Sequence, residues 1–182
     1  LGDIRAQVSS LMVGVDRLDR LFRKYGKQVV QTACVDLLDY SERRMRLGLA
    51  AIPQGVYYGE DFIDDDGIND TPIRVAVKLT IADGKAIVDL TGSDPQAEGN
   101  TNSTIANTYA AAYYVMIAVV DPHMPPNSGC YRPIEVITKP GTIVDPKPPG
   151  AVAARPNCSQ KIVEAMLRAL AQAVPDRVCA GG

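Results

Sequence analysis

Residues 73–81 alternate strictly between apolar and polar side chains, and no other segment constrains the fold of this chain as strongly. A period of two is typical of a strand with one buried face. The next residues, Asp83 and Gly84, suit a two-residue turn with positive φ. Residues 85–90 then resume the alternation, so the sequence predicts a β-hairpin.

A further strand is predicted upstream, at residues 56–63, and it would join the hairpin through the acidic turn at residues 64–67 (DDDG). The three strands would form an antiparallel meander. The acidic turn does not match a calcium loop of the EF-hand type, because Phe62 stands at the first ligand position and Ile73 at the twelfth. We interpret it as a solvated turn between strands.

The first 53 residues follow a helical period instead. Apolar side chains recur at steps of four and three, which is typical of the seam of a helix packed along another helix. Gly26 can end this first helix. The seam comprises Ile4, Val8, Leu11, Val15, Leu18 and Phe22.

A second helical run follows Gly26 and closes at Pro53. Two long helices with a tight connection predict an antiparallel helical hairpin over residues 1–53, and residues 54–182 would then form an α+β domain. The seam itself fits intramolecular packing or a contact between subunits. The second run comprises Val30, Cys34, Leu38, Ser41, Met45, Leu49 and Ile52.

The remaining elements complete an α+β fold in which helices pack on the sheet. The uncharged run at residues 109–120 predicts a buried helix, capped by Ser103 or Thr104. A short strand is predicted at residues 134–138. A last helix is predicted at residues 159–173, ended by Pro175.

Composition excludes several classes of function. The formal net charge of −2 gives no basic field for nucleic acid, and the longest apolar run is shorter than the roughly 20 residues that cross a bilayer. One histidine and four cysteines without a CxxC pair do not form a usual zinc set. We expect these cysteines to be reduced thiols, which favours a cytoplasmic location. Because the chain opens at Leu1 without a methionine, we expect it to be part of a longer protein.

The first candidate site is the proline-rich loop around Asn127 to Arg132. Asn127 and Gly129 tolerate left-handed backbone geometry, so this loop can bend sharply. Cys130 follows the bend, and the guanidinium of Arg132 would favour a thiolate. The alternatives of a catalytic cysteine and a buried structural one remain open.

Two further polar segments are candidates. The passage at residues 91–107 contains Asn102 and other amides beside glycines, which can bind a planar amide or simply form turns; it has no phosphate-binding glycine pattern. The second segment, residues 155–160, opens the last helix, where free N–H groups and Arg155 would attract an anion. Its alternative is helix capping.

Five motifs occur along the chain in a recognisable order. They are GDIRAQ (residues 2–7), LLDYSERRMR (37–46), DLTGSDPQAEGNTNS (89–103), PPNSGCYRPIEV (125–136) and CSQKIVEAMLRALAQAVPDRV (158–178). Through them the chain resembles the hydantoinase B/oxoprolinase family over essentially all 182 residues.

The resemblance implies a B-type subunit of an ATP-dependent enzyme that opens a cyclic amide, such as N-methylhydantoinase or 5-oxoprolinase. It implies a cytoplasmic heteromeric complex in which an A-type subunit with an actin/hexokinase-like fold binds ATP and magnesium and phosphorylates the substrate. This chain would bind neither cofactor. Family segments rich in His and Asp, associated with metal in the carboxylases, have no counterpart here, so any metal would lie elsewhere in the full-length subunit.

Positions that match the family motifs give the expected site. The resemblance places the thiol nucleophile at Cys130 and substrate contacts at Asn102, Asn127, Gly129, Arg132, Ser159 and Gln160. Oxoprolinase-like members often carry a Gly-Gly-Asn run where this chain has AARPN (153–157), which favours a hydantoinase-like or an unassigned substrate. Two alternatives stay open: a subunit of an ATP-dependent ketone carboxylase, and a non-catalytic assembly domain within the B-type subunit.

Overall fold

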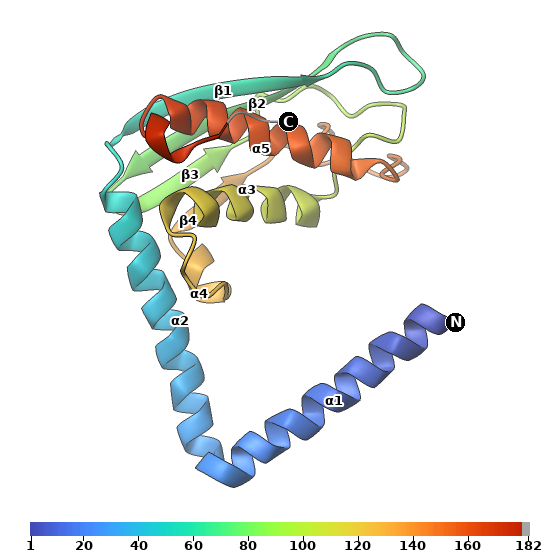
Figure 1. Cartoon of the computed structure of the whole chain (residues 1–182). Helices are drawn as coiled ribbons and strands as arrows, with labels where there is room; N and C mark the ends of the chain where they lie inside the picture. Colours follow the sequence, from blue (N-terminus) through green and yellow to red (C-terminus); the bar gives the residue numbers. More distant parts are fainter. Residues whose placement is uncertain (180–182) are drawn as a thin grey trace. The chain divides into compact units, whose positions relative to one another are not determined.

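The computed structural model describes residues 1–179 and contains two compact units, Leu1–Tyr40 and Ser41–Gly182. The first unit holds α1 (Gly2–Tyr25) and the beginning of α2 (Lys27–Ala50). The second holds the rest of α2 and all four strands (Figure 1). The fold class is the mixed α+β arrangement that the sequence predicts, with a helical pair at the N-terminus and helices packed on a sheet.

The sheet has the strand order β1-β2-β3-β4. The predicted meander is confirmed: β1 (Gly55–Ile63) pairs antiparallel with β2 (Ile73–Ala82), which pairs antiparallel with β3 (Lys85–Asp89). At the turn between β2 and β3, Asp83 and Gly84 have φ angles of 50° and 66°, the positive values that such a turn requires.

The fourth strand lies parallel to its neighbour. β4 (Ile134–Ile137) pairs with β3, and the chain crosses between them through α3 (Ile105–Val120), since parallel strands need a long crossover. The Oγ1 atom of Thr104 accepts a hydrogen bond from the N–H of Asn107 at 3.3 Å, so the predicted cap of this helix is Thr104.

Helices α3 and α5 (Arg155–Ala171) lie side by side on the face of the sheet to which the apolar side chains of β2 point (Figure 1). The contact between α5 and β1 is so close that a Cβ atom on Gly59 would lie 2.0 Å from the carbonyl oxygen of Ala165. The core is formed by side chains of the sheet, these two helices and the end of α2, including Val75, Leu79, Met116, Ile162, Met166, Met45 and Leu49.

The N-terminal helices are present where the sequence predicts them. α1 ends at Tyr25, and Gly26 follows with a φ of 84°. However, no residue of α1 is buried, so its apolar seam is not covered as an antiparallel hairpin would require. In α2, by contrast, the second run is buried at Ser41, Met45 and Leu49.

The proline-rich loop contains a helical turn that the sequence did not predict. Residues Ser128–Tyr131 form α4, and Asn127 caps it with an extended backbone at φ −160°. The sharp bend that the sequence allows is made without left-handed backbone, since neither Asn127 nor Gly129 has a positive φ. A short helical turn reverses the chain instead. Across residues 1–179, no helix is both long and apolar enough to span a membrane.

Candidate functional site

A polar cavity of about 390 Å³ lies at the start of α5. Three segments that are distant in sequence form it: the loop between β1 and β2, the passage after β3, and the first turns of α5. These segments gather at one end of the sheet in Figure 1. The lining residues are Ile63, Asp64, Asp65, Asp66, Gly67, Asn100, Thr101, Asn157, Gln160 and Lys161.

The β1–β2 loop is fixed to the passage after β3 by Asp66. Its carboxylate accepts hydrogen bonds from the backbone N–H groups of Ile68, Asn69 and Gly99, the last at 3.0 Å. The N–H groups of Asn69, Gly99 and Ile68 hold the pKa of Asp66 well below its usual value. Gly99 is required here, because a Cβ atom would lie 1.8 Å from the Asp66 carbonyl oxygen.

The interpretation of this acidic turn as a solvated one was therefore wrong for Asp66, which is only 5% exposed. Its two neighbours, Asp64 and Asp65, are exposed and line the cavity. The buried carboxylate thus holds the loop in place while the exposed ones remain available to a ligand.

Asn102 stabilises the passage after β3 by hydrogen bonds from its buried amide group. It is fully buried, and its amide group donates to the carbonyl oxygens of Ala97, Gly99 and Ala151 and accepts from the N–H of Ala97. All of these bonds are made within the protein. Asn102 therefore shapes the wall of the cavity, and its predicted contact with substrate stays a prediction.

The start of α5 is joined to the same passage. The N–H of Ala154 donates to the carbonyl oxygen of Asn100 at 2.9 Å, and the amide of Asn107 donates to the hydroxyl of Ser159. Ser159 in turn donates to the carbonyl oxygen of Arg155 at 3.1 Å. Two of the three predicted polar segments thus meet.

The helix start does not offer the expected backbone anion site. Pro156 has no N–H, and the N–H groups of Arg155 and Asn157 already donate to the carbonyl oxygens of Val152 and Ala154. Polar side chains, rather than free backbone N–H groups, therefore face a ligand at this end of α5.

The cavity has two walls of different character. The β1–β2 loop supplies the carboxylates of Asp64 and Asp65, which accept hydrogen bonds. α5 supplies the amides of Asn157 and Gln160 and the ammonium group of Lys161, whose Nζ atom lies 3.7 Å from Asp61 and 3.3 Å from Glu164. A small ligand with a donor on one side and an acceptor on the other would match these walls.

Thr101 adds an unsatisfied group to the cavity. Its residue is 5% exposed, and its Oγ1 atom is buried without a hydrogen-bond partner among the described residues. A buried hydroxyl without a partner costs free energy, and native proteins rarely retain one without a reason. A ligand would reach this hydroxyl only if the surrounding passage shifted, because the Oγ1 atom has almost no accessible surface.

The predicted loop residues lie elsewhere, around α4. Asn127 accepts a hydrogen bond from the N–H of Gly129 and donates to the hydroxyl of Ser41 at 2.7 Å. Cys130 is fully buried, with its Sγ atom 3.3 Å from the carbonyl oxygen of Pro125. This loop follows the C-terminal end of α3, which is about 24 Å from its N-terminal end. None of these residues lines the polar cavity.

Arg132 is engaged in a charged cluster with α2. Its Nη1 atom lies 3.0 Å from Glu42, which also accepts two hydrogen bonds from Arg46. The hydrogen bonds from Arg132 and Arg46 lower the pKa of Glu42. The cluster ties the loop to α2, and the guanidinium of Arg132 is directed at Glu42.

The four cysteines are all free. Cys34 and Cys179 are exposed, and Cys158 is buried within α5. Burial raises the pKa of Cys158 to about 12, so this side chain is a neutral thiol at ordinary pH. Within residues 1–179, no group of three or more His, Cys, Asp or Glu side chains is arranged to hold a metal ion.

Sequence reasoning did not predict the acidic wall, Lys161 or Thr101 as part of a site, and it included Asn157 only within the candidate segment 155–160. One signal was available for the wall. The connection between Ile63 and Ile73 is longer than the two to five residues that are common in β-hairpin loops, and long loops frequently form binding sites. For Thr101 no sequence signal distinguishes its hydroxyl from those of the neighbouring turn.

The structure thus shows an α+β domain with a polar cavity at the start of α5. The family model for hydantoinase B/oxoprolinase matches residues 1–182, so the chain belongs to this family. The B-type component of a putative D-/L-hydantoinase from Pseudomonas sp. (strain NS671) is 33% identical over 100% of the chain and 32% of its own length. The beta component of the caprolactamase of Pseudomonas jessenii is 32% identical, over 98% and 31%.

Solved structures agree with this family. The ATP-dependent caprolactamase of Pseudomonas jessenii matches with a TM-score of 0.80 and 29% identity, over 97% of this chain and 31% of that one. A nucleotide-free acetone carboxylase structure matches with a TM-score of 0.75 at 16% identity, over 90% of this chain and 24% of that one, which is a likeness of fold. The chain spans about one third of the length of the hydantoinase and caprolactamase relatives.

Proposed function

We propose that this chain is the part of a B-type subunit that binds a cyclic amide for ATP-dependent ring opening, with the polar cavity at the start of α5 as the binding site. One observation supports the proposal most directly. In this member of the hydantoinase B/oxoprolinase family, an acidic loop and the amide side chains at the start of α5 line the same cavity of about 390 Å³. Cavities of about 300 to 1,000 Å³ are usual for small ligands.

A cyclic amide fits the two walls of this cavity. Its ring holds an N–H donor and a carbonyl acceptor on adjacent atoms. The carboxylates of Asp64 and Asp65 can accept from the N–H, while Asn157 and Gln160 can donate to the carbonyl oxygen. Such positioning raises the rate because a bound, oriented ring reacts as part of one molecule.

The acidic wall also bears on how the ring is activated. Two exposed carboxylates beside one lysine disfavour a bound phosphate group at this spot. Phosphorylation of the amide oxygen is therefore assigned to a partner A-type subunit, which binds ATP and magnesium. In this proposal the complex is heteromeric and cytoplasmic, and the cavity presents the ring to that partner.

The nucleophilic role of Cys130 stays a separate prediction, because Cys130 is fully buried in the loop of α4 and does not line the polar cavity. A test by Cys130→Ser has a matched control in Cys158→Ser, since both side chains are fully buried. Loss of turnover only in Cys130→Ser, with unchanged unfolding, would support a nucleophile. Equal activity in both variants would remove Cys130 from the reaction.

The substrate is tested with the full-length protein and its A-type partner. We expect ATP-dependent turnover of hydantoin, 5-oxoproline or caprolactam, measured by the release of phosphate and of the opened ring. Asn157→Ala should raise KM about tenfold, because one hydrogen bond to the ring is lost. Turnover of a ketone with bicarbonate, and of none of the three rings, would contradict the proposal and favour the carboxylase alternative.

A further inference from the structure

Within the unit Leu1–Tyr40, no residue covers the apolar seam of α1. Five of its side chains are between 45% and 69% exposed: Ile4, Val8, Leu11, Val15 and Leu18. Most helices in proteins are stabilised by packing of an apolar face, and α1 also contains Gly14, which weakens a helix. We therefore expect a second surface to pack against this seam.

We propose that the seam of α1 pairs with α1 of a second copy of this chain, with the two helices antiparallel. The inference is independent of the function proposed above. The proposed partner is a second copy because the pattern of apolar and charged residues along α1 is complementary to itself when one helix is reversed.

The apolar residues match over the full helix in this arrangement. With Met12 and Gly14 near the centre, each seam residue meets an apolar partner, and a bulky residue is opposite a smaller one in the central layers. The layers are Ile4 opposite Phe22, Val8 opposite Leu18, and Leu11 opposite Val15, each occurring twice.

The charges that flank the seam distinguish the two orientations. Arg5 and Asp19 lie on the same side of the seam, each one residue after a seam residue. In an antiparallel pair, Arg5 of one copy lies beside Asp19 of the other, and this happens at both ends. In a parallel pair the same two residues are about 21 Å apart along the axis.

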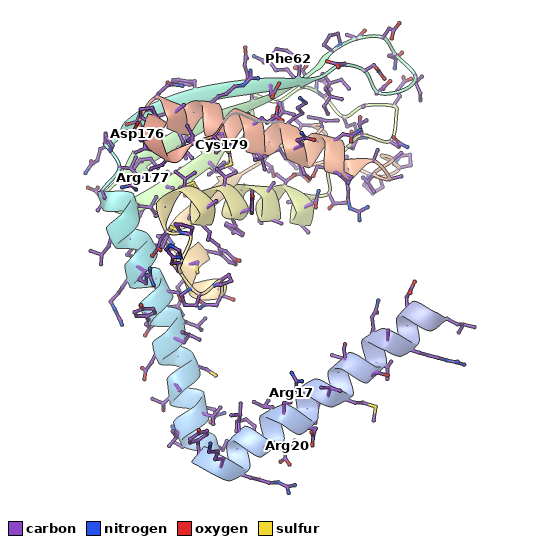
Figure 2. The ribbon with its side chains drawn as sticks, viewed as in Figure 1. Arg17, Arg20, Phe62, Asp176, Arg177 and Cys179 are labelled. Carbon is purple, nitrogen blue, oxygen red and sulfur yellow. The ribbon has the colours of Figure 1, made fainter. Side chains whose placement is uncertain are left out.

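The other charged residues of α1 do not prevent the pairing of Arg5 with Asp19 of the second copy. Asp19 forms an exposed ion pair with Arg23 of its own helix at 2.8 Å, and its carboxylate can accept from Arg5 of the second copy as well. Arg17 and Arg20, labelled in Figure 2, extend from α1 outside the seam, and Arg20 pairs with Asp16. None of these groups places a charge within an apolar layer.

The association is tested with two matched substitutions in the 182-residue chain. Val15 is in the seam and 69% exposed, whereas Val13 is on the opposite side of the helix and 50% exposed. By sedimentation equilibrium we expect a dimer for the natural chain, at least about tenfold weaker association for Val15→Asp, and unchanged association for Val13→Asp. A monomer at concentrations up to about 100 µM, or equal weakening by both substitutions, would overturn the proposal.

The ion pair is tested by exchange of charge. Arg5→Glu or Asp19→Arg alone should weaken the dimer severalfold, because each brings like charges together twice. The double variant restores opposite charges and should recover association. Failure of the double variant to recover would contradict the antiparallel pairing of these residues.

The relative direction of the two α1 helices is determined from disulfide formation. The chains used carry Cys34→Ser and Cys179→Ser, which remove the two exposed thiols. Ile4→Cys alone should not cross-link, since the two copies of residue 4 are about 27 Å apart along the axis. A mixture of Ile4→Cys and Phe22→Cys chains should form the mixed disulfide. Cross-linking of Ile4→Cys to itself would show a parallel pair and overturn the proposal.

Discussion

The seam of α1 and the second half of α2 carry the same helical pattern, but only one of them is buried. In α2, Met45 and Leu49 are fully buried in the core of the second unit. In α1, Leu11 and Val15 are each 69% exposed. Periodicity thus identifies an apolar face and leaves open what covers it. In α2 the cover is within the chain, and in α1 we place it in a second copy.

The greatest change in stability is expected from a pair of glycines, one in the core and one in α1. Gly59→Ala would place a Cβ atom 2.0 Å from the carbonyl oxygen of Ala165, so α5 must move away from β1. We expect the free energy of unfolding to fall by about 3 kcal/mol, measured by urea denaturation. Gly14→Ala in α1 meets nothing within 4 Å and should raise helix content in circular dichroism. Equal destabilisation by both would contradict the contrast between the buried and exposed helices.

A pair of leucines gives an effect of similar size. Leu49→Ala removes a fully buried side chain from the core and should cost about 3 kcal/mol in the free energy of unfolding. Leu11→Ala should change the unfolding of the dilute monomer by less than about 0.5 kcal/mol and weaken self-association instead. If the two substitutions cost the same in dilute protein, then α1 is packed within the chain.

The smallest effect concerns the loop that bears the cavity, and it depends on pH. The folded state lowers the pKa of Asp66 below its ordinary value of 3.8, so this carboxylate stabilises the fold above about pH 4 and the stabilisation is lost as pH falls. Asp66→Asn should lower the melting temperature at neutral pH and reduce its further decrease in acid.

Asp65→Asn is the control for this substitution, because Asp65 is exposed and its one bond, from the N–H of Gly67, can also be accepted by an amide oxygen. The two variants should differ most at about pH 7, and the difference should shrink steadily as the pH falls below about 4. An equal loss at neutral pH would show that the buried hydrogen bonds of Asp66 do not hold the loop.

Much of the sheet could be predicted from the sequence because its signals are local. The alternation of residues 73–81, the turn at Asp83 and Gly84, and the cap at Thr104 are all set by side chains within a few positions of each other. The family could likewise be identified from five motifs, each a continuous stretch.

The candidate site was harder to predict because it depends on contacts across the chain. Asp66 meets Gly99, and Ala154 meets Asn100, pairs that no local pattern joins. Asn102 was identified as a substrate contact because of its chemistry, but the structure uses its amide to hold three carbonyl oxygens. Amides suit substrates and turns equally well, and only burial separates the two uses.

The proposed function depends on the acidic wall of the cavity binding the substrate ring, and two aspartates of one loop provide the decisive test. Asp64 lines the cavity, whereas Asp70 is exposed in the same loop outside it. In the full-length protein with its partner, Asp64→Ala should lower kcat/KM for the cyclic amide about tenfold or more, because the acceptor for the ring N–H is lost, and Asp70→Ala should leave it within about twofold. Unchanged kcat/KM in both variants would contradict binding of the ring at this wall.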